Sequence, residues 1–351
     1  MNLKKTVALI SGGEGYEHKI SELSSENLFS LIDKKRYDVF LIHINTDGGW
    51  YISRGECEKY IKFSTSGENF EECFPAMLGG VSGFFTNAGV IPIDCAIPCL
   101  HGNFGEDGNV QGALSAAHIP YVGQDVYASA LTSDKIYTKI LAESLGIPTA
   151  RWIFSDGKSL DAAKNAAQEK LSYPLFIKPA RLGSSYGASP VSGESEFENA
   201  FINARNYDER ILIEEFIEFD HELECALFDN GERVIFPGGR ILSSGAFYDY
   251  ASKYTKSLSP KTEAKTDAFT DTERKIAEYS ALLADLIGIR HLSRFDFFVT
   301  TDEKIFFNEI NAFPGMTETS LYPRLVEAVK KKSGGFINLL IDKVCSDDRR
   351  V

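Results

Sequence analysis

Two apolar runs in the C-terminal third of the chain carry polar side chains two positions apart. The run RFDFFV contains Arg294 and Asp296, and the run IFFNEIN contains Glu309 and Asn311. Side chains of a strand alternate between its two faces, so each pair shares a face. If the TDEK segment between the runs makes a two-residue turn at 302–303, Asp296 lies opposite Glu309 and Arg294 lies opposite Asn311. A bulge would change this register.

The predicted sheet face therefore combines two carboxylates with a carboxamide. Buried anions need a cation or protons. A pair of acids that share a proton is one interpretation, but Asn311 does not titrate, and an all-oxygen set suits a hard cation that also borrows substrate phosphates. We interpret Asp296, Glu309 and Asn311 as a magnesium site. The alternative is a satisfied polar network at a strand end.

A second segment, FIKPARLGSSYGAS, has the residue types that bind phosphate. Its apolar run ends at Lys178, and a small loop with Ser184 and Ser185 between glycines follows. Glycines let backbone amides approach phosphate oxygens, hydroxyls add donors, and lysine supplies charge. Lys135 is a second candidate cation. Taken singly, the loop could be a surface hairpin and a lysine such as Lys135 a solvated charge; Lys178 is the exception, since it ends an apolar run.

Two common nucleotide motifs are absent from the sequence. The glycines after the first apolar run do not complete G-x-G-x-x-G, because the final position is His18. No G-x-x-x-x-G-K-[ST] occurs either. Any nucleotide site must therefore depend on another arrangement.

The elements that position these residues fall into three blocks. Up to about residue 123, short apolar runs such as TVALIS, DVFLIHI and DCAIPCL alternate with helical stretches, which predicts a parallel α/β sheet. From residue 124, a helix with Thr132 or Ser133 as N-cap precedes strands around a second helix. A third block runs from ELECALF through a long helix to the hairpin described above.

Composition limits the class of protein. With 351 residues the chain fits two or three domains, and 43% hydrophobic and 25% charged residues are typical of a soluble globular protein. The net charge of -13 argues against binding to nucleic acid or anionic lipid. No apolar run approaches the ~18 residues of a membrane span, and the start is expected to be a buried strand rather than a signal peptide. The six scattered cysteines indicate a reduced cytoplasmic protein.

The order of these features resembles that of ATP-grasp ligases. The segments LHGNFGEDGNVQG, GQDVYASALTSDKIYTK and NEINAFPGMTETSLYP narrow the resemblance to the D-alanine:D-alanine ligases of peptidoglycan synthesis, over nearly the whole chain. The resemblance implies an N-terminal parallel-sheet domain (1–123) followed by a two-lobed ATP-grasp fold of α+β character (124–213 and 214–351). It also implies ATP bound between the two lobes and a homodimer.

The resemblance assigns an ATP site. Lys135 and Lys178 would contact the α and β phosphates, and the loop of Ser184 and Ser185 would close over the γ end. Two Mg²⁺ ions, for which Mn²⁺ could substitute, would lie at Asp296, Glu309 and Asn311. Further expected nucleotide contacts are Glu214, Glu215, Phe216 and Ile217 at the adenine, Glu222 at the ribose, and Lys253 at the γ-phosphate.

The resemblance also assigns a substrate site. Glu17 would bind the ammonium of the first D-alanine and form a triad with Ser184 and Tyr254, while Arg294 and the Gly315 amide would stabilise the oxyanion. Other expected substrate contacts are His101, Tyr248, Ser320 and Leu321. Three simpler interpretations stay open: Glu17 as a first-turn helix acid, His101 as a structural turn residue, and Arg294 as the ion-pair partner of Asp296.

Several activities are consistent with these residues. D-alanine is expected at both sites, because Leu321 stands where D-serine-using relatives tend to carry arginine; D-serine or D-lactate as second substrate is the alternative. Another ATP-grasp carboxylate-amine ligase or a non-catalytic nucleotide-binding module are further alternatives. Lys19 near Glu17, and Leu182 before the Gly/Ser loop, depart from the family pattern and bear on amine binding and lid closure.

Overall fold

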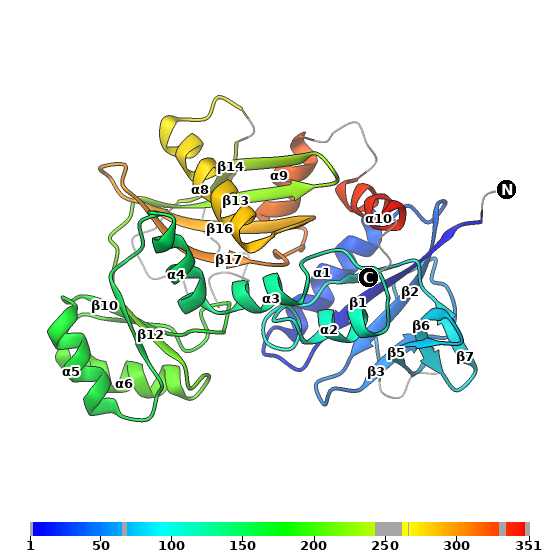
Figure 1. The fold of residues 1–351 in the computed structure, drawn as a ribbon, viewed down its shortest axis with the longest axis horizontal. Coiled ribbons are helices and arrows are strands. Elements are labelled where there is room, and N and C mark those ends of the chain that lie inside the picture. Colours follow the sequence, from blue (N-terminus) through cyan, green and yellow to red (C-terminus); the bar gives the residue numbers. More distant parts are fainter. Residues whose placement is uncertain (1–2, 65–68, 243–261, 266, 330–334, 348–351) are drawn as a thin grey trace.

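The computed structural model describes residues 3–64, 69–242, 262–265, 267–329 and 335–347 (Figure 1). A five-stranded sheet organises the N-terminal part, in the order β4-β3-β2-β1-β8. Its strands are β1 (Lys5–Gly12), β2 (Tyr37–Ile44), β3 (Trp50–Ser53), β4 (Phe70–Glu72) and β8 (Cys95–Pro98). Strand β1 pairs in parallel with both β2 and β8, whereas β3 and β4 add an antiparallel edge. The sheet is therefore parallel at its centre, as its apolar runs predict, and mixed overall.

The central strand β1 is buried because it is apolar on both faces. Residues Val7 to Ile10 are completely inaccessible to solvent. Helices α1 (His18–Leu31) and α2 (Asn109–Ala116) belong to this part of the fold, and α1 packs against β1. The sequence analysis did not anticipate a small antiparallel sheet beside it, made of β5 (Phe74–Leu78), β6 (Val81–Thr86) and β7 (Gly89–Pro92).

A four-stranded antiparallel sheet forms the green lobe of Figure 1. Its order is β11-β10-β12-β9, from strands β9 (Trp152–Ser155), β10 (Leu175–Pro179), β11 (Ser189–Val191) and β12 (Ile211–Glu215). Helices α5 (Leu160–Lys170) and α6 (Glu194–Arg205) accompany it. Phe197 and Phe201, one turn apart on α6, are buried in its core with the strands.

The second five-stranded sheet carries the C-terminal half of the site. Its order is β15-β14-β13-β16-β17, and every pairing is antiparallel. Its strands are β13 (His221–Asp229), β14 (Arg233–Leu242), β15 (Thr262–Ala264), β16 (Leu292–Val299) and β17 (Ile305–Asn311). The helix α8 (Asp271–Ile287) packs on this sheet. It begins with a capping box of Thr270 and Glu273 and ends at Gly288, whose φ of 80° favours glycine.

Four further helices connect the sheets. They are α3 (Val126–Ser133), α4 (Lys135–Ser144), α9 (Leu321–Val329) and α10 (Phe336–Ser346). Both α3 and α4 contact β17, and α10 contacts α1 and β8, so the last helix packs on the N-terminal part (Figure 1). Buried residues of the first and last sheets therefore share one hydrophobic core.

The N-cap expected for the helix after residue 124 was wrong. Thr132 and Ser133 lie in the last turn of α3, and a separate helix, α4, starts at Lys135. The N-cap of α4 is Asp134, whose carboxylate accepts a hydrogen bond from the amide of Ile136. The predicted helix therefore begins slightly later than expected, because Asp134, in an extended conformation, caps its start.

The hairpin between β16 and β17 differs from the expected two-residue turn. The Thr300 amide bonds the Lys304 carbonyl, so the loop has an extra residue, and Glu303 adopts a left-handed φ of 61°. This shift would misalign the polar residues, but a bulge between Asp296 and Phe297 restores the pairing. Asp296 consequently lies opposite Glu309, and Arg294 opposite Asn311, so the predicted pairs are confirmed although the predicted two-residue turn is wrong.

Two further features are the length of the helices relative to a membrane and the state of the cysteines. Among the described residues, none of the helices combines the length and apolarity needed to cross a bilayer. All six cysteines are free, and Cys95 and Cys99 are completely buried, as expected for core residues.

Candidate active site

A cavity of about 690 Å³ lies where the four-stranded sheet, the second five-stranded sheet and the N-terminal part meet. Every predicted site residue that the structure describes lines it. These residues are Glu17, His101, Lys135, Lys178, Ser184, Ser185, Glu214, Glu215, Phe216, Ile217, Glu222, Arg294, Asp296, Glu309, Asn311, Gly315, Ser320 and Leu321. The other three predicted residues, Tyr248, Lys253 and Tyr254, lie outside the described residues.

Lys135 reaches the cavity from the first turn of α4. Its ammonium lies 3.1 Å from the Glu309 carboxylate and donates to the Leu182 carbonyl at 2.8 Å. Burial alone would lower the pKa of Lys135, but the attraction of Glu309 outweighs it and raises the pKa above its ordinary value. Lys135 is therefore a fixed positive charge. The side chain of Leu182 is itself buried, and its backbone serves the site.

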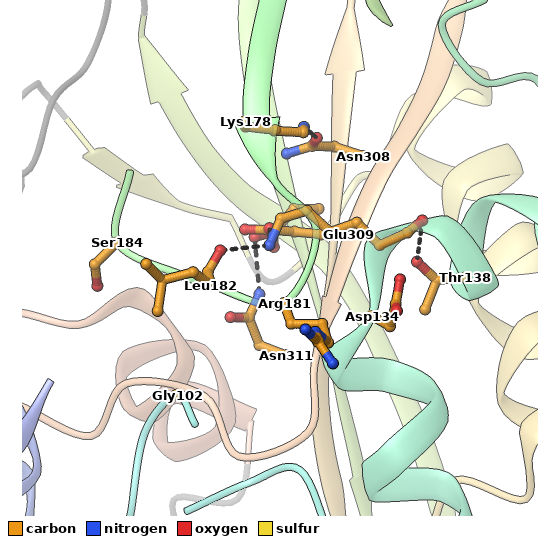
Figure 2. Close-up of polar contacts among 12 residues, drawn as sticks. Gly102, Asp134, Thr138, Lys178, Arg181, Leu182, Ser184, Asn308, Glu309 and Asn311 are labelled. Carbon is orange, nitrogen blue, oxygen red and sulfur yellow. Dashed lines mark hydrogen bonds and ion pairs between the residues drawn. The ribbon is translucent and has the colours of Figure 1, made fainter. Parts of the chain in front are cut away.

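Lys178 ends β10 beside a buried carboxylate. Its ammonium lies 2.7 Å from Glu214 and donates to Asn308 at 3.0 Å (Figure 2). The other oxygen of Glu214 lies 2.9 Å from Lys139, whose side chain is 1% exposed. Sequence analysis missed Lys139, although its position in α4, one turn after Lys135, was a usable signal. Glu214 thus neutralises two buried lysines through its side chain, beyond the contact to adenine expected of it.

Burial and the two lysines have opposite effects on the pKa values of this triad. Burial would raise the pKa of Glu214, but Lys139 and Lys178 lower it to about 2. The pKa of Lys178 is lowered, first by burial and then by the positive charges of Lys139 and Lys135, against the attraction of Glu214. A further anion near Lys178, such as a phosphate, would relieve this excess of positive charge.

The proposed metal ligands face one another across the hairpin. Asp296 receives two hydrogen bonds of 2.7 Å from Arg294 and one of 3.1 Å from the Asn311 amide. Glu309 is balanced by Lys135. The alternative interpretation of Arg294, an ion pair with Asp296, is therefore correct for this structure, and Arg294 also lines the cavity. Asp296 is buried, whereas Glu309 and Asn311 are half-buried. Their carboxylate and amide oxygens on one wall fit a hard divalent cation.

The Gly/Ser loop touches the N-terminal part through Glu17. The hydroxyl of Ser184 donates a short hydrogen bond to Glu17, and both Ser184 and Ser185 hold positive φ values, 51° and 59°. Such φ values are uncommon outside glycine and mark a backbone that its surroundings constrain. Gly102 has a left-handed φ of 69°, which favours glycine, and a Cβ atom there would lie 2.5 Å from the Glu17 carboxylate, which would have to move.

Glu17 precedes α1 without capping it. Its side chain makes no cap hydrogen bond to the helix, which disfavours the interpretation as a simple helix acid. Lys19, the departure from the family pattern, is exposed, and its ammonium lies 3.1 Å from Glu22.

Sequence analysis also missed Glu106, which lines the same cavity. Its carboxyl group accepts hydrogen bonds from the amides of Gly102 (3.1 Å) and Phe313 (3.3 Å) and so joins two loops. Burial, and then the charge of Glu17, raise the pKa of Glu106 to about 8. Only the fold brings Glu106 next to Glu17, although its segment GEDG lies in a quoted motif.

Small polar groups surround the far end of the cavity. The Nε2 atom of His101 lies 3.0 Å from the Ser24 hydroxyl, and burial lowers the pKa of His101 to about 4, so the ring is neutral at pH 7. His101 therefore combines a structural contact with a place in the cavity wall. A Cβ atom on Gly315 would lie 3.2 Å from the Ser320 hydroxyl. Because glycine has no Cβ, the backbone at this position can lie close to the cavity. Leu321 begins α9 and is buried.

Comparison with known proteins matches this geometry to a single family. The model described as D-ala D-ala ligase N-terminus matches residues 6–124, and the model described as D-ala D-ala ligase C-terminus matches residues 141–343. The chain belongs to the D-alanine–D-alanine ligase family. It is accordingly an ATP-dependent ligase with an ATP-grasp fold, as the order of its motifs predicted.

Individual relatives cover almost the whole chain. The D-alanine–D-alanine ligase of Thermoanaerobacter sp. (strain X514) is 36% identical, over 97% of this chain and 96% of its own length. That of Chlorobium luteolum is 37% identical, over 95% and 94%. Among solved structures, the D-alanine-D-alanine ligase of Coxiella burnetii has a TM-score of 0.84 at 28% identity, over 97% of this chain and 94% of its own. The VanG D-Ala:D-Ser ligase of Enterococcus faecalis has a TM-score of 0.83 at 33% identity, over 97% and 98%.

Proposed function

We propose that the protein joins two molecules of D-alanine at the expense of ATP, through a D-alanyl phosphate, for peptidoglycan synthesis. The observation that carries this proposal is the convergence of two buried lysines, an oxygen-rich strand pair and Glu17 on one cavity. Glu17 binds an ammonium group, the lysines bind phosphate, and a carboxylate held between them is phosphorylated. An unrelated carboxylate-amine ligase would share the phosphate residues but has no need of Glu17 and Ser320 together.

The nucleotide lies along the side of the cavity that the central lobe forms. Apolar walls from Phe176, Phe216 and Phe298 suit the adenine ring, with the backbone of 214–217 as hydrogen-bonding partner. Glu222 binds the ribose hydroxyls. Lys135 and Lys178 bind the α and β phosphates, and the loop at 184–185 covers the γ end, joined by Lys253.

Asp296, Glu309 and Asn311 would hold two Mg²⁺ ions, which Mn²⁺ could replace. Bound there, the ions would supply positive charge to the transferred phosphoryl group. Arg294 and Lys135, which pair with Asp296 and Glu309, would then also act on substrate oxygens. The donor set supports this assignment, because its members are all oxygen ligands on one wall.

Side chains and backbone amides of the protein orient the substrates and stabilise the charge that forms during the reaction. Glu17 orients the first D-alanine by its ammonium so that its carboxylate faces the γ-phosphate. Arg294 and the Gly315 amide donate to the oxyanion that forms when the second amine attacks the acyl phosphate. Tyr254 completes the lid triad with Glu17 and Ser184. His101 and Tyr248 complete the substrate walls.

Ser320 and Leu321 determine the specificity for the second substrate. The hydroxyl of Ser320 binds its carboxylate, and the apolar Leu321 packs against a methyl group. A D-serine hydroxyl would find no charged partner at Leu321. The similarity to a D-Ala:D-Ser ligase makes D-serine the one competing second substrate that a specific observation favours.

The deciding experiment measures phosphate release with ATP, Mg²⁺ and each candidate second substrate. We expect D-alanine to stimulate ATP turnover and to be preferred over D-serine and D-lactate at neutral pH. A preference for D-serine would change the substrate but not the mechanism. No stimulation by D-alanine would contradict the proposal and favour a nucleotide-binding module without ligase activity.

We also propose how the chain is divided into domains and how it assembles. We place the domains at 1–123, 124–213 and 214–351; separate sheets support the three parts, although α3 and α4 pack on the last sheet. A cytoplasmic homodimer is expected from the family resemblance. Light scattering of the purified protein tests the dimer, since a monomer mass would exclude it.

A further inference from the structure

A second group of side chains with metal-binding chemistry lies in the N-terminal part, and none of its members lines the large cavity. His18 and Glu22 are four residues apart on one face of α1, and His43 comes from β2. One potential ligand atom from each of the three lies within 4.8 Å of the others. The Nε2 atom of His18 and the Oε1 atom of Glu22 are 3.6 Å apart.

The backbone orients His18 for such a role. Its Nδ1 atom lies 2.7 Å from the carbonyl oxygen of Gly13. A carbonyl oxygen only accepts, so Nδ1 donates to it, and the second ring nitrogen, Nε2, lies on the side of Glu22. Metal-binding histidines are commonly held by this kind of hydrogen bond from the second ring nitrogen.

His43 is held in place by packing. Its ring is 3% exposed, stacks on Phe63 with the centroids 4.1 Å apart, and meets the His18 ring edge-on at 5.1 Å. These contacts hold the His43 ring in place beside His18.

We propose that His18, Glu22 and His43 bind a divalent transition-metal ion of the Zn²⁺ class, with water as a further ligand. Two imidazoles and one carboxylate suit such an ion and are a poor set for Mg²⁺. Ligand atoms of a tetrahedral zinc site lie about 3.4 Å apart, so small side-chain movements complete the geometry. A cavity of about 50 Å³, lined by Glu22 and His43, has room for the water.

The ion would join α1 to β2 immediately after Glu17. It would thereby fix the start of the helix that Glu17 precedes, without contact to ATP or D-alanine. This inference does not depend on the proposed function, and its test uses neither substrate.

The test is a calorimetric titration of metal-stripped, full-length protein with Zn²⁺ in excess Mg²⁺, which occupies the oxygen site. We expect one Zn²⁺ per chain, with affinity reduced about 100-fold or more in Glu22→Gln and in His43→Gln, since even indirect partners of a metal cost 10–100-fold. Glu22 is partly exposed, so this variant remains informative if His43→Gln misfolds. Co²⁺ should give a visible absorption band that the same variants lose.

Two matched variants serve as controls. His118→Asn removes an exposed histidine elsewhere in the N-terminal part, and Glu309→Gln alters the oxygen site. Both should bind Zn²⁺ like the unmodified protein. The proposal is overturned if Zn²⁺ does not bind in excess Mg²⁺, or if the Glu22 and His43 variants bind it unchanged. Loss of binding in Glu309→Gln would equally overturn it, because the ion would then lie in the active site.

Discussion

Replacing Glu214 by glutamine should destabilise the central lobe strongly, because this carboxylate is the shared counter-ion of Lys139 and Lys178. The three side chains are almost completely buried, with ammonium-to-carboxylate distances of 2.7 and 2.9 Å. A glutamine keeps the shape but removes the charge. Two buried ammonium groups would then lose their compensation, and each would have to release its proton or move toward water.

The magnitude follows from the pKa of Glu214. Its fall from 4.5 to about 2 corresponds to about 3 kcal/mol at roughly 1.4 kcal/mol for each pKa unit. Breaking a buried ion pair on one side typically costs about 3–5 kcal/mol. We therefore expect Glu214→Gln to reduce the free energy of unfolding by about 3 kcal/mol at pH 7.

Trp152 offers a local probe, because it is paired with Glu214 in the neighbouring strand. In a Trp50→Phe background it is the only tryptophan of the chain, so urea unfolding followed by its fluorescence reports on this sheet. The control is Glu215→Gln, whose partner Arg151 is 65% exposed; a loss below about 1 kcal/mol is expected there. Equal effects of the two substitutions would refute the reasoning.

The pH dependence gives an independent check with a defined sign. The folded-state pKa of Glu214 is depressed, so its stabilisation is complete above the ordinary value of 4.5 and is lost as the pH falls toward about 2. The difference in unfolding free energy between the unmodified protein and Glu214→Gln should therefore shrink over this interval. A difference that stays constant between pH 5 and pH 2.5 would contradict the assigned charge.

Three further outcomes are expected. Glu309→Gln should remove most phosphate release while its circular dichroism stays unchanged, whereas Glu303→Gln in the exposed hairpin turn should keep full activity; near-normal turnover of the first variant would exclude Glu309 as a metal ligand. Leu321→Arg should shift the choice of second substrate from D-alanine toward D-serine, measured as the ratio of kcat/KM values. The pKa of Glu106 is raised to about 8 in the folded protein, so this residue lowers the free energy of unfolding as the pH rises from 4.5 to 8. Between pH 5 and pH 9, Glu106→Gln should therefore lose less unfolding free energy than the unmodified protein. An equal loss in the two proteins would show that Glu106 is not protonated in the folded state.

Local features of the sequence were sufficient for much of the fold and the site. Alternation in RFDFFV and IFFNEIN predicted that the polar residues of each run share a sheet face, because side-chain direction in a strand depends only on residue parity. The apolar run before Lys178 similarly predicted a buried lysine at the end of β10. Such patterns can be recognised in the sequence because they depend only on residues that are close together in the chain.

Tertiary structure decided what depends on distant parts of the chain. The sequence did not determine the length of the turn between β16 and β17. A bulge between Asp296 and Phe297 compensates for the extra turn residue, because the pairing of the whole strands contributes more than the preference of one turn. Glu106 has its unusual pKa only because folding buries it beside Glu17, and Lys139 meets Glu214 only when α4 packs over β12. His18 and His43 likewise approach each other across a helix and a strand. Burial and charge proximity are properties of the folded chain, so residue types could nominate these groups but could not set their chemistry.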